Sequence, residues 1–241
     1  MKFLLTCLFI LVQFIVEGSI VVDTFAVGPQ TVTANSGNNN ASQSLSGLDT
    51  AHVLDGQRRI TVQGNMSVGS IVATVDTSNG GSFAYSSNNP AFTDAFGGRL
   101  LLTHIAGDRS NTFDLSQFAS EFYIIDFESS FFGGSGSFAA TLNVSSPSGS
   151  DSTSLTIDET GSPFQVSVPI SELSGADLSQ AYNLTLDISG LPSTAAFEIS
   201  NISFSSSVPE PRAVTLLVLA ILILATSSLF KSRRQAEHVT N

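Results

Sequence analysis

The middle of the chain alternates apolar and polar residues with the period of two that is typical of β-strands. In residues 138–145, 164–170 and 183–188 every second residue is apolar. This alternation places one face of a strand on a core and the other face in water. Similar patterns occur in eight further segments: Ile20–Phe25, Arg59–Gln63, Ser70–Asp76, Ser82–Ser86, Arg99–Ile105, Glu121–Phe127, Thr153–Ile157 and Phe197–Phe204. Short strands separated by Gly, Ser, Asn and Asp turns predict an all-β protein, specifically a β-sandwich.

Three local features refine this picture. In the last strand the apolar spacing shifts between Ile199 and Ile202, which predicts a bulge at Ser200-Asn201. Residues 36–46, rich in Asn, Ser and Gly, are typical of a loop or disordered arm. No segment has a strong helical period, although residues 113–120 and 171–180 have room for one helical turn each.

Both ends of the chain carry apolar segments. Lys2 precedes a mostly apolar stretch over residues 3–16, and small residues follow at the end of it. This pattern is typical of a secretory signal peptide, residues 1–18, with cleavage expected after Gly18. An uncleaved anchor is the alternative, but the stretch is shorter than the ~20 residues that span a bilayer.

The C-terminal apolar segment, residues 213–230, is longer. As a helix its eighteen residues reach about 27 Å, close to the hydrocarbon thickness of a bilayer. The basic cluster that follows, Lys231, Arg233 and Arg234, is expected on the cytoplasmic side. The sequence therefore predicts a transmembrane helix with the N-terminal domain outside and a short cytoplasmic tail, residues 235–241.

The segment just before this helix reads Val208-Pro209-Glu210-Pro211. Over residues 208–234 this motif is followed by an apolar helix and then by an Arg-rich end. The three features, in this order at the C-terminus, resemble a PEP-CTERM sorting signal. The resemblance implies processing by a membrane-embedded exosortase in Gram-negative bacteria that make exopolysaccharide. Pro209, Glu210 and Pro211 match the recognition motif. Residues 235–241 extend beyond the usual end of such a signal, and a plain single-pass anchor is the alternative.

Residues 19–207 remain as one exported domain of a size that supports a single core. This domain contains seventeen acidic residues and four arginines, and the whole chain has a net charge of −11. This acidity argues against nucleic acid and other anionic partners. From Phe113 onward the domain loosely resembles jelly-roll domains of the carbohydrate-binding type, a resemblance of architecture that includes the closing strand 199–204.

The residues that could support catalysis are sparse in this domain. His52 and His104 are its two histidines, and neither has a nucleophile-elbow motif nearby. Two histidines without cysteine are also too few for a zinc site. A glycosidase needs a pair of catalytic carboxylates, and the sequence offers two candidate pairs, Asp126/Glu128 and Asp158/Glu159. For both pairs an exposed polar strand face is the simpler interpretation. We therefore predict that the protein is not an enzyme.

A calcium ion is the one cofactor that the sequence offers a place for. Asp108, Asn111 and Asp114 form a compact loop of oxygen ligands, and a solvated turn is the alternative. Sugar binding is less favoured because the chain has no Trp to stack on a ring, although recognition by polar loops stays open.

Together these features predict an exported surface or extracellular-matrix protein with a structural or adhesive domain. Its expected partners are the Sec translocon, signal peptidase and an exosortase. We expect the protein to be anchored transiently in the inner membrane and then to reach the cell envelope or the extracellular matrix. A module that binds exopolysaccharide is the first alternative, and a simple membrane-anchored exported protein is the second.

Overall fold

The computed structural model describes residues 20–92, 97–104, 112–131, 137–158 and 163–205. The chain divides into two compact units, Met1–Ser207 and Val208–Asn241, and every described residue belongs to the first. The predicted signal peptide (1–18), sorting signal (208–234) and tail (235–241) lie outside the described residues. Within the described ranges no helix is long and apolar enough to cross a membrane.

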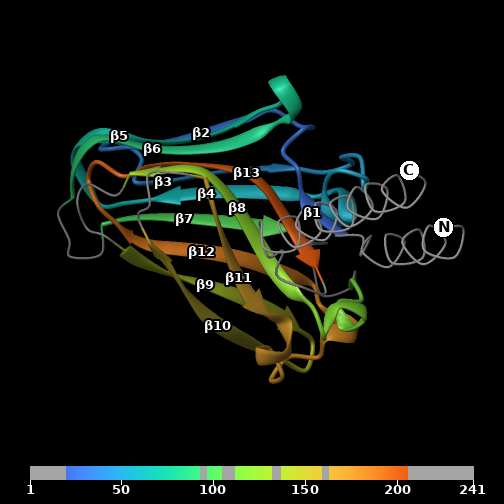
Figure 1. Ribbon diagram of the computed structural model, residues 1–241. Helices are drawn as coiled ribbons and strands as arrows, with labels where there is room; N and C mark the ends of the chain where they lie inside the picture. Colours follow the sequence, from blue (N-terminus) through green and yellow to red (C-terminus); the bar gives the residue numbers. More distant parts are fainter. Residues whose placement is uncertain (1–19, 93–96, 105–111, 132–136, 159–162, 206–241) are drawn as a thin grey trace, which may run out of the picture. The chain divides into compact units, whose positions relative to one another are not determined.

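Two antiparallel sheets form the described unit, as the alternation predicts (Figure 1). The seven-stranded sheet runs in the order β11-β8-β13-β6-β5-β2, with β1 also paired to β13. Its strands are β1 (Ile20–Asp23), β2 (Gln30–Asn35), β5 (Met66–Asp76), β6 (Ser82–Phe92), β8 (Phe122–Phe131), β11 (Phe164–Pro169) and β13 (Ala196–Ser205).

The six-stranded sheet runs in the order β10-β9-β12-β7-β4-β3. Its strands are β3 (Asn40–Leu45), β4 (Arg58–Gln63), β7 (Gly98–His104), β9 (Ser137–Ser146), β10 (Gly149–Asp158) and β12 (Asn183–Leu191). Short 3₁₀ turns connect some strands: η1 (Leu54–Gly56), η2 (Ser78–Gly80), η3 (Ser116–Phe118), η4 (Ile170–Glu172) and η5 (Leu178–Gln180). The single turn predicted within residues 113–120 is thus confirmed as η3, whereas residues 171–180 contain η5 and the last two residues of η4.

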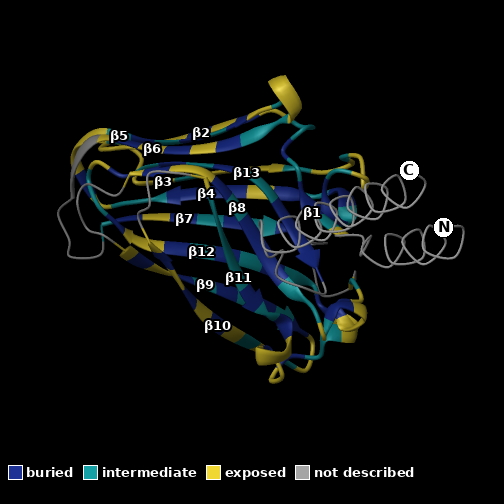
Figure 2. Cartoon of the chain, in the orientation of Figure 1, coloured by how far each residue is buried: buried dark blue, intermediate teal, exposed yellow. Residues whose placement is uncertain are grey.

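The apolar residues of both sheets face one another and form the core. Figure 2 shows the alternation along the strands, with buried positions next to exposed ones. The ring of Phe197 on β13 stacks on the ring of Tyr85, with 5.0 Å between the ring centroids. Its centroid lies 6.4 Å from that of Phe138 in the six-stranded sheet, so aromatic contacts join the two layers. The polar residues of the alternation are left on the outer face of each sheet.

Two predictions about local structure have opposite outcomes. The bulge at Ser200-Asn201 is confirmed, because the register with β8 shifts between Ile199 and Asn201. The interpretation of residues 36–46 as a loop or arm is wrong, since Asn40–Leu45 forms β3 and pairs along its whole length with β4. This strand is polar because it is an edge strand, so its main-chain hydrogen bonds hold it without a large apolar face.

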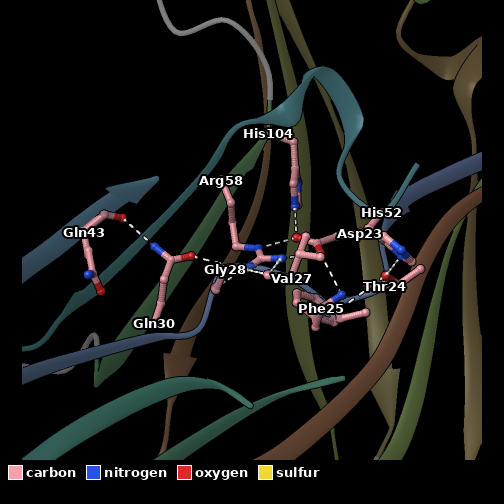
Figure 3. Close-up of polar contacts among 11 residues, drawn as sticks. Asp23, Thr24, Phe25, Val27, Gly28, Gln30, Gln43, His52, Arg58 and His104 are labelled. Atoms are coloured by element: carbon pink, nitrogen blue, oxygen red, sulfur yellow. Dashed lines mark hydrogen bonds and ion pairs between the residues drawn. The ribbon is translucent and has the colours of Figure 1, made fainter. Parts of the chain in front are cut away.

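A buried ion pair connects the two sheets near one end of the sandwich (Figure 3). Asp23 ends β1 of the seven-stranded sheet, and Arg58 begins β4 of the six-stranded sheet. The Arg58 Nε donates to Asp23 Oδ2 at 2.6 Å, and Nη2 donates to Oδ1 at 2.7 Å. Both side chains are fully buried. His104, the register partner of Arg58 on β7, places Nε2 3.0 Å from Asp23 Oδ2.

Further hydrogen bonds hold both members of this pair, whereas the buried Nδ1 of His104 has no hydrogen-bond partner among the described residues. Arg58 donates to the carbonyl oxygens of Val27 and Gly28, and Asp23 Oδ1 accepts from the backbone of Phe25. Burial alone raises the pKa of Asp23, but the hydrogen bonds from His104 and Arg58 outweigh it and lower the pKa below the usual value. The carboxylate is therefore ionised at neutral pH, and the two charges stabilise each other in a dry environment.

We expect Arg58→Met to lower the free energy of unfolding by about 3–5 kcal/mol, because it leaves the Asp23 carboxylate buried without its cation. Urea unfolding followed by circular dichroism measures the loss. The double variant Asp23→Asn/Arg58→Met should recover part of it, since the orphaned charge is then removed. A loss below about 1 kcal/mol in Arg58→Met, the range of exposed pairs, would contradict the role given to this pair.

Candidate functional site

The outer face of the six-stranded sheet carries a continuous row of polar side chains. The strand registers align Arg59 of β4 with Ser44 of β3 on one side and with Thr103 of β7 on the other. Thr103 is then aligned with Thr185 of β12, and that row continues through Asn143 of β9. Ser152 of β10 ends it. One unbroken row of hydrogen-bonding groups thus crosses all six strands.

A second row lies two residues further along the strands. It contains Ser42, Thr61, Leu101, Asp187, Thr141 and Ser154, and Leu101 is its apolar member. Neighbouring strands are ~4.8 Å apart and successive rows are ~7 Å apart along the strands, so the polar groups form a regular lattice. Such a face offers donors and acceptors at many positions of an extended ligand.

Arg99 and Asp187 form the charged element of this face. The Arg99 Nε donates to Asp187 Oδ1 at 2.9 Å and Nη2 donates to Oδ2 at 2.6 Å, a planar bidentate pair. The hydrogen bond to Asp187 raises the pKa of Arg99. Its side chain is 45% exposed, against 16% for Asp187. The guanidinium is therefore oriented by the protein, yet it remains open to a ligand.

The polar face is hollowed rather than flat. A hollow of about 450 Å³ spans β3, β4, β7, β12 and β9, and Leu101 is the one apolar residue among the described residues that line it. A second hollow of about 610 Å³ shares Asn40, Gln63, Arg99 and Asp187 with the first. It extends the same groove past Arg99 toward Gly64 and Gly97. We call these two hollows together the polar groove.

The described lining of the polar groove consists mainly of groups that form hydrogen bonds. Thr103 Oγ1 and Thr185 Oγ1 are 3.0 Å apart, and Thr185 Oγ1 donates to Asn183 Oδ1 at 2.5 Å. These contacts fix the hydroxyl groups in place while leaving lone pairs and amide groups open to solvent. Asp187 is the one carboxylate that lines the groove within the described residues, and Arg99 already occupies it.

The two histidines are placed in structural positions. His104 is fully buried against Asp23, as its strand context predicts. His52 lies in a loop and places Nδ1 3.1 Å from Thr24 Oγ1. Neither histidine lines the polar groove.

The carboxylate pairs do not come together as acid and base. Asp126 and Glu128 are both on β8, and Asp126 accepts from Gln165 Nε2 at 2.7 Å and from Asn201 Nδ2 at 3.0 Å. These two amide donors hold the Asp126 carboxylate in place, and Glu128 is exposed on the same strand. Asp158 is exposed at the end of β10, and Glu159 lies outside the described residues.

The structure describes one of the three residues that were predicted to bind calcium. Asp114 accepts from the backbone nitrogen and the hydroxyl of Ser116, at 2.8 and 2.5 Å, in an exposed turn. Asp108 and Asn111 lie outside the described residues, so the calcium site stays a prediction. Over the described ranges no three His, Cys, Asp or Glu side chains gather as a metal-binding group.

The sorting residues stay predictions for the same reason. Pro209, Glu210 and Pro211 lie outside the described part of the chain, as do Lys231, Arg233 and Arg234. The residues of the polar groove, by contrast, were missed by the sequence analysis. Their signal was present: the outward positions of β4, β7, β9 and β12 are mostly Thr, Asn, Gln and Ser, and they include no Lys or Glu.

Comparisons with known proteins give structural likenesses only. No protein-family model matches the chain, and no curated protein does. A family 30 carbohydrate-binding module is 15% identical, with a TM-score of 0.44 over 81% of this chain and 90% of that one. The family 30 module of a Clostridium thermocellum cellulosomal cellulase is also 15% identical, with a TM-score of 0.42 over 78% and 96%.

An exo-β-agarase structure gives a TM-score of 0.40 at 16% identity over 58% of this chain. The match spans 22% of that enzyme, and another of the matched structures is likewise covered over 22% of its length. All three TM-scores are below 0.5, so these likenesses carry no argument about this chain, and its site must be judged from its own residues.

We expect Arg99→Gln to lower the free energy of unfolding by less than about 1 kcal/mol, because the Arg99–Asp187 pair is open to solvent. Thermal and urea unfolding measure the change, and Asp187→Asn should give a similar small loss since it breaks the same pair. A loss above about 3 kcal/mol would show that the pair is a structural element of the fold rather than an accessible part of the groove.

Proposed function

We propose that the sandwich, jelly-roll-like in its architecture, is a non-catalytic domain that binds polysaccharide in the polar groove. The observation that carries this proposal is the hollowed, in-register lattice of hydroxyl, amide and guanidinium groups across the six-stranded sheet. A polysaccharide is an extended chain of hydroxyl groups, and a face with donors and acceptors at regular spacing matches it along several sugar units.

The chemistry of the lining supports this binding mode over the alternatives. An apolar partner is disfavoured because Leu101 is the one apolar residue among the described residues that line the hollow of about 450 Å³. Catalysis on a glycoside needs two free carboxylates, and the groove offers the paired Asp187 alone among its described lining residues. Without an aromatic platform among those residues, hydrogen bonds set the affinity, so weak binding repeated along a polymer is expected.

A purely structural or adhesive role without a ligand is the second candidate. The in-register pairing and the large shared core make a rigid scaffold, and these features are present whether or not the groove is occupied. The two candidates differ in one measurable property, which is the binding of soluble polysaccharide by the isolated protein.

We expect Thr103→Val/Thr185→Val to weaken polysaccharide binding about tenfold, because it removes two hydroxyl groups at the centre of the groove while keeping the shape and β-propensity of each side chain. Affinity electrophoresis of the purified full-length chain in gels that contain β-glucan, galactan or polygalacturonate measures the effect.

The matched control is Thr31→Val/Thr33→Val, which makes the same change at two exposed positions of β2 on the seven-stranded sheet. It should migrate like the unsubstituted protein. Equal retardation of both double variants would place binding elsewhere, and no retardation of the unsubstituted protein on any glycan would leave the structural role as the answer.

We further propose that this domain is delivered by the Sec route and that residues 208–234 act as a PEP-CTERM-like sorting signal cut by an exosortase. The order of Pro209-Glu210-Pro211, apolar segment and basic cluster supports this proposal. The destination would be the cell envelope or the extracellular matrix, where exopolysaccharide is available to the groove.

We expect Glu210→Ala to abolish C-terminal processing, because it removes the one charged residue within the recognition motif. Intact mass spectrometry should find chains that end near Pro209–Pro211 in exosortase-positive cells, and chains that reach Asn241 in the variant. Glu237→Ala, the same change in the tail, should be processed normally. If the unsubstituted chain reaches Asn241 in cells with and without the exosortase, the sorting proposal is wrong.

A further inference from the structure

The charges of the described residues are separated between the two sheets. The arginines within the described ranges are Arg58, Arg59 and Arg99, and all three belong to the six-stranded sheet. Arg58 is buried in the pair with Asp23, whereas Arg59 and Arg99 face outward and line the polar groove. The acidic residues on the outer face of this sheet are Asp187 and Asp158, among the residues described.

Arg59 differs from the other two because no described residue neutralises it. Arg58 and Arg99 each hold a carboxylate in a bidentate pair, but no ion pair joins Arg59 to any acid in the described part of the chain. Its neighbours in the row are the hydroxyl residues Ser44 and Thr103. Asp55, four residues earlier in η1, lies 3.5 Å from Gln57 Nε2 instead.

The distances in the sheet show that the outward acids do not compensate Arg59. Asp187 is two strands and one row away, which is about 12 Å, and Asp158 is four strands and three rows away, about 28 Å. Both separations exceed the ~8 Å screening length at physiological salt, and Asp187 is already paired. Among the described residues, therefore, no acid of this outer face compensates the positive charge of Arg59 in the groove.

We propose that the ligand of the groove is an acidic polysaccharide, and that Arg59 binds a carboxylate of one of its sugar units. This inference rests on the proposed function, since it names the class of glycan that the groove takes. A guanidinium holds a carboxylate with two parallel hydrogen bonds, and the hydroxyl groups of Ser44, Thr103 and Thr185 lie beside it for the ring hydroxyls.

The overall charge of −11 opposes an anionic ligand at long range. That repulsion is reduced by salt beyond about 8 Å, whereas a bidentate contact at hydrogen-bond distance is much less affected. The local charge of the groove, rather than the net charge of the chain, then decides which polymer is held. Under this proposal the groove binds an anionic glycan, although the net charge of the chain argues against anionic partners in general.

The test compares polygalacturonate with the same polymer after methyl esterification, which keeps the sugar backbone and removes the charge. The full-length protein, purified from a host without an exosortase, is titrated with both by isothermal calorimetry at about 150 mM salt, a condition in which long-range charge effects are screened. We expect polygalacturonate to bind at least about tenfold more tightly than its ester, and Arg59→Gln to remove this difference because it weakens binding of polygalacturonate more than binding of the ester.

Two variants separate this inference from the function on which it rests. Thr33→Asp lowers the net charge by one unit, as Arg59→Gln does, but on β2 of the other sheet, and it should keep the preference. Thr103→Val/Thr185→Val should weaken the binding of both polymers by a similar factor. Equal affinity of the unsubstituted protein for the two polymers would overturn the proposal of an acidic ligand, and so would an unchanged preference in Arg59→Gln. Either result would leave the proposal of glycan binding intact. Absence of binding to both polymers and to neutral glycans would overturn both proposals.

Discussion

The buried pair of Asp23 and Arg58 is the constraint on which the arrangement of the two faces depends. Arg58 is the first residue of β4, and its guanidinium is held inside the sandwich by Asp23 and by the carbonyl groups of Val27 and Gly28. Because side chains alternate along a strand, anchoring Arg58 inward sends Arg59 outward into the groove. A slip by one residue would put Arg59 in the place of Arg58, but it would also turn the buried side chains of Ile60 and Val62 out into water, so these apolar positions fix the register together with the pair.

The two faces of the six-stranded sheet then have separate tasks. The inner face supplies apolar side chains to the shared core, and its rigidity holds the outer rows in register. The outer face is built from neutral polar groups, two arginines and few acids, although the domain as a whole is strongly acidic. The proposed binding surface requires neither a loop nor an aromatic platform, since the pairing of five or six strands spaces its groups.

Much of the architecture follows from the sequence because period-two patterns act locally. The strands at 138–145, 164–170 and 183–188 and the bulge near Ser200 are confirmed for that reason. The edge strand Asn40–Leu45 was missed because its stability comes from main-chain pairing with β4, which leaves little mark on side-chain pattern. The groove was missed because its residues are spread over strands that are far apart in the chain.

The sequence by itself determined that the domain is mostly β-sheet and, for the strands that it predicted, which residues face the core. Only the tertiary structure decided that Arg58 is buried while Arg59 is open, since two adjacent arginines look alike until a partner from a distant strand is placed. It also decided where the positive charge lies. Net charge is a sum over residues, but binding depends on the charges within a screening length of the ligand, and strand order sets those.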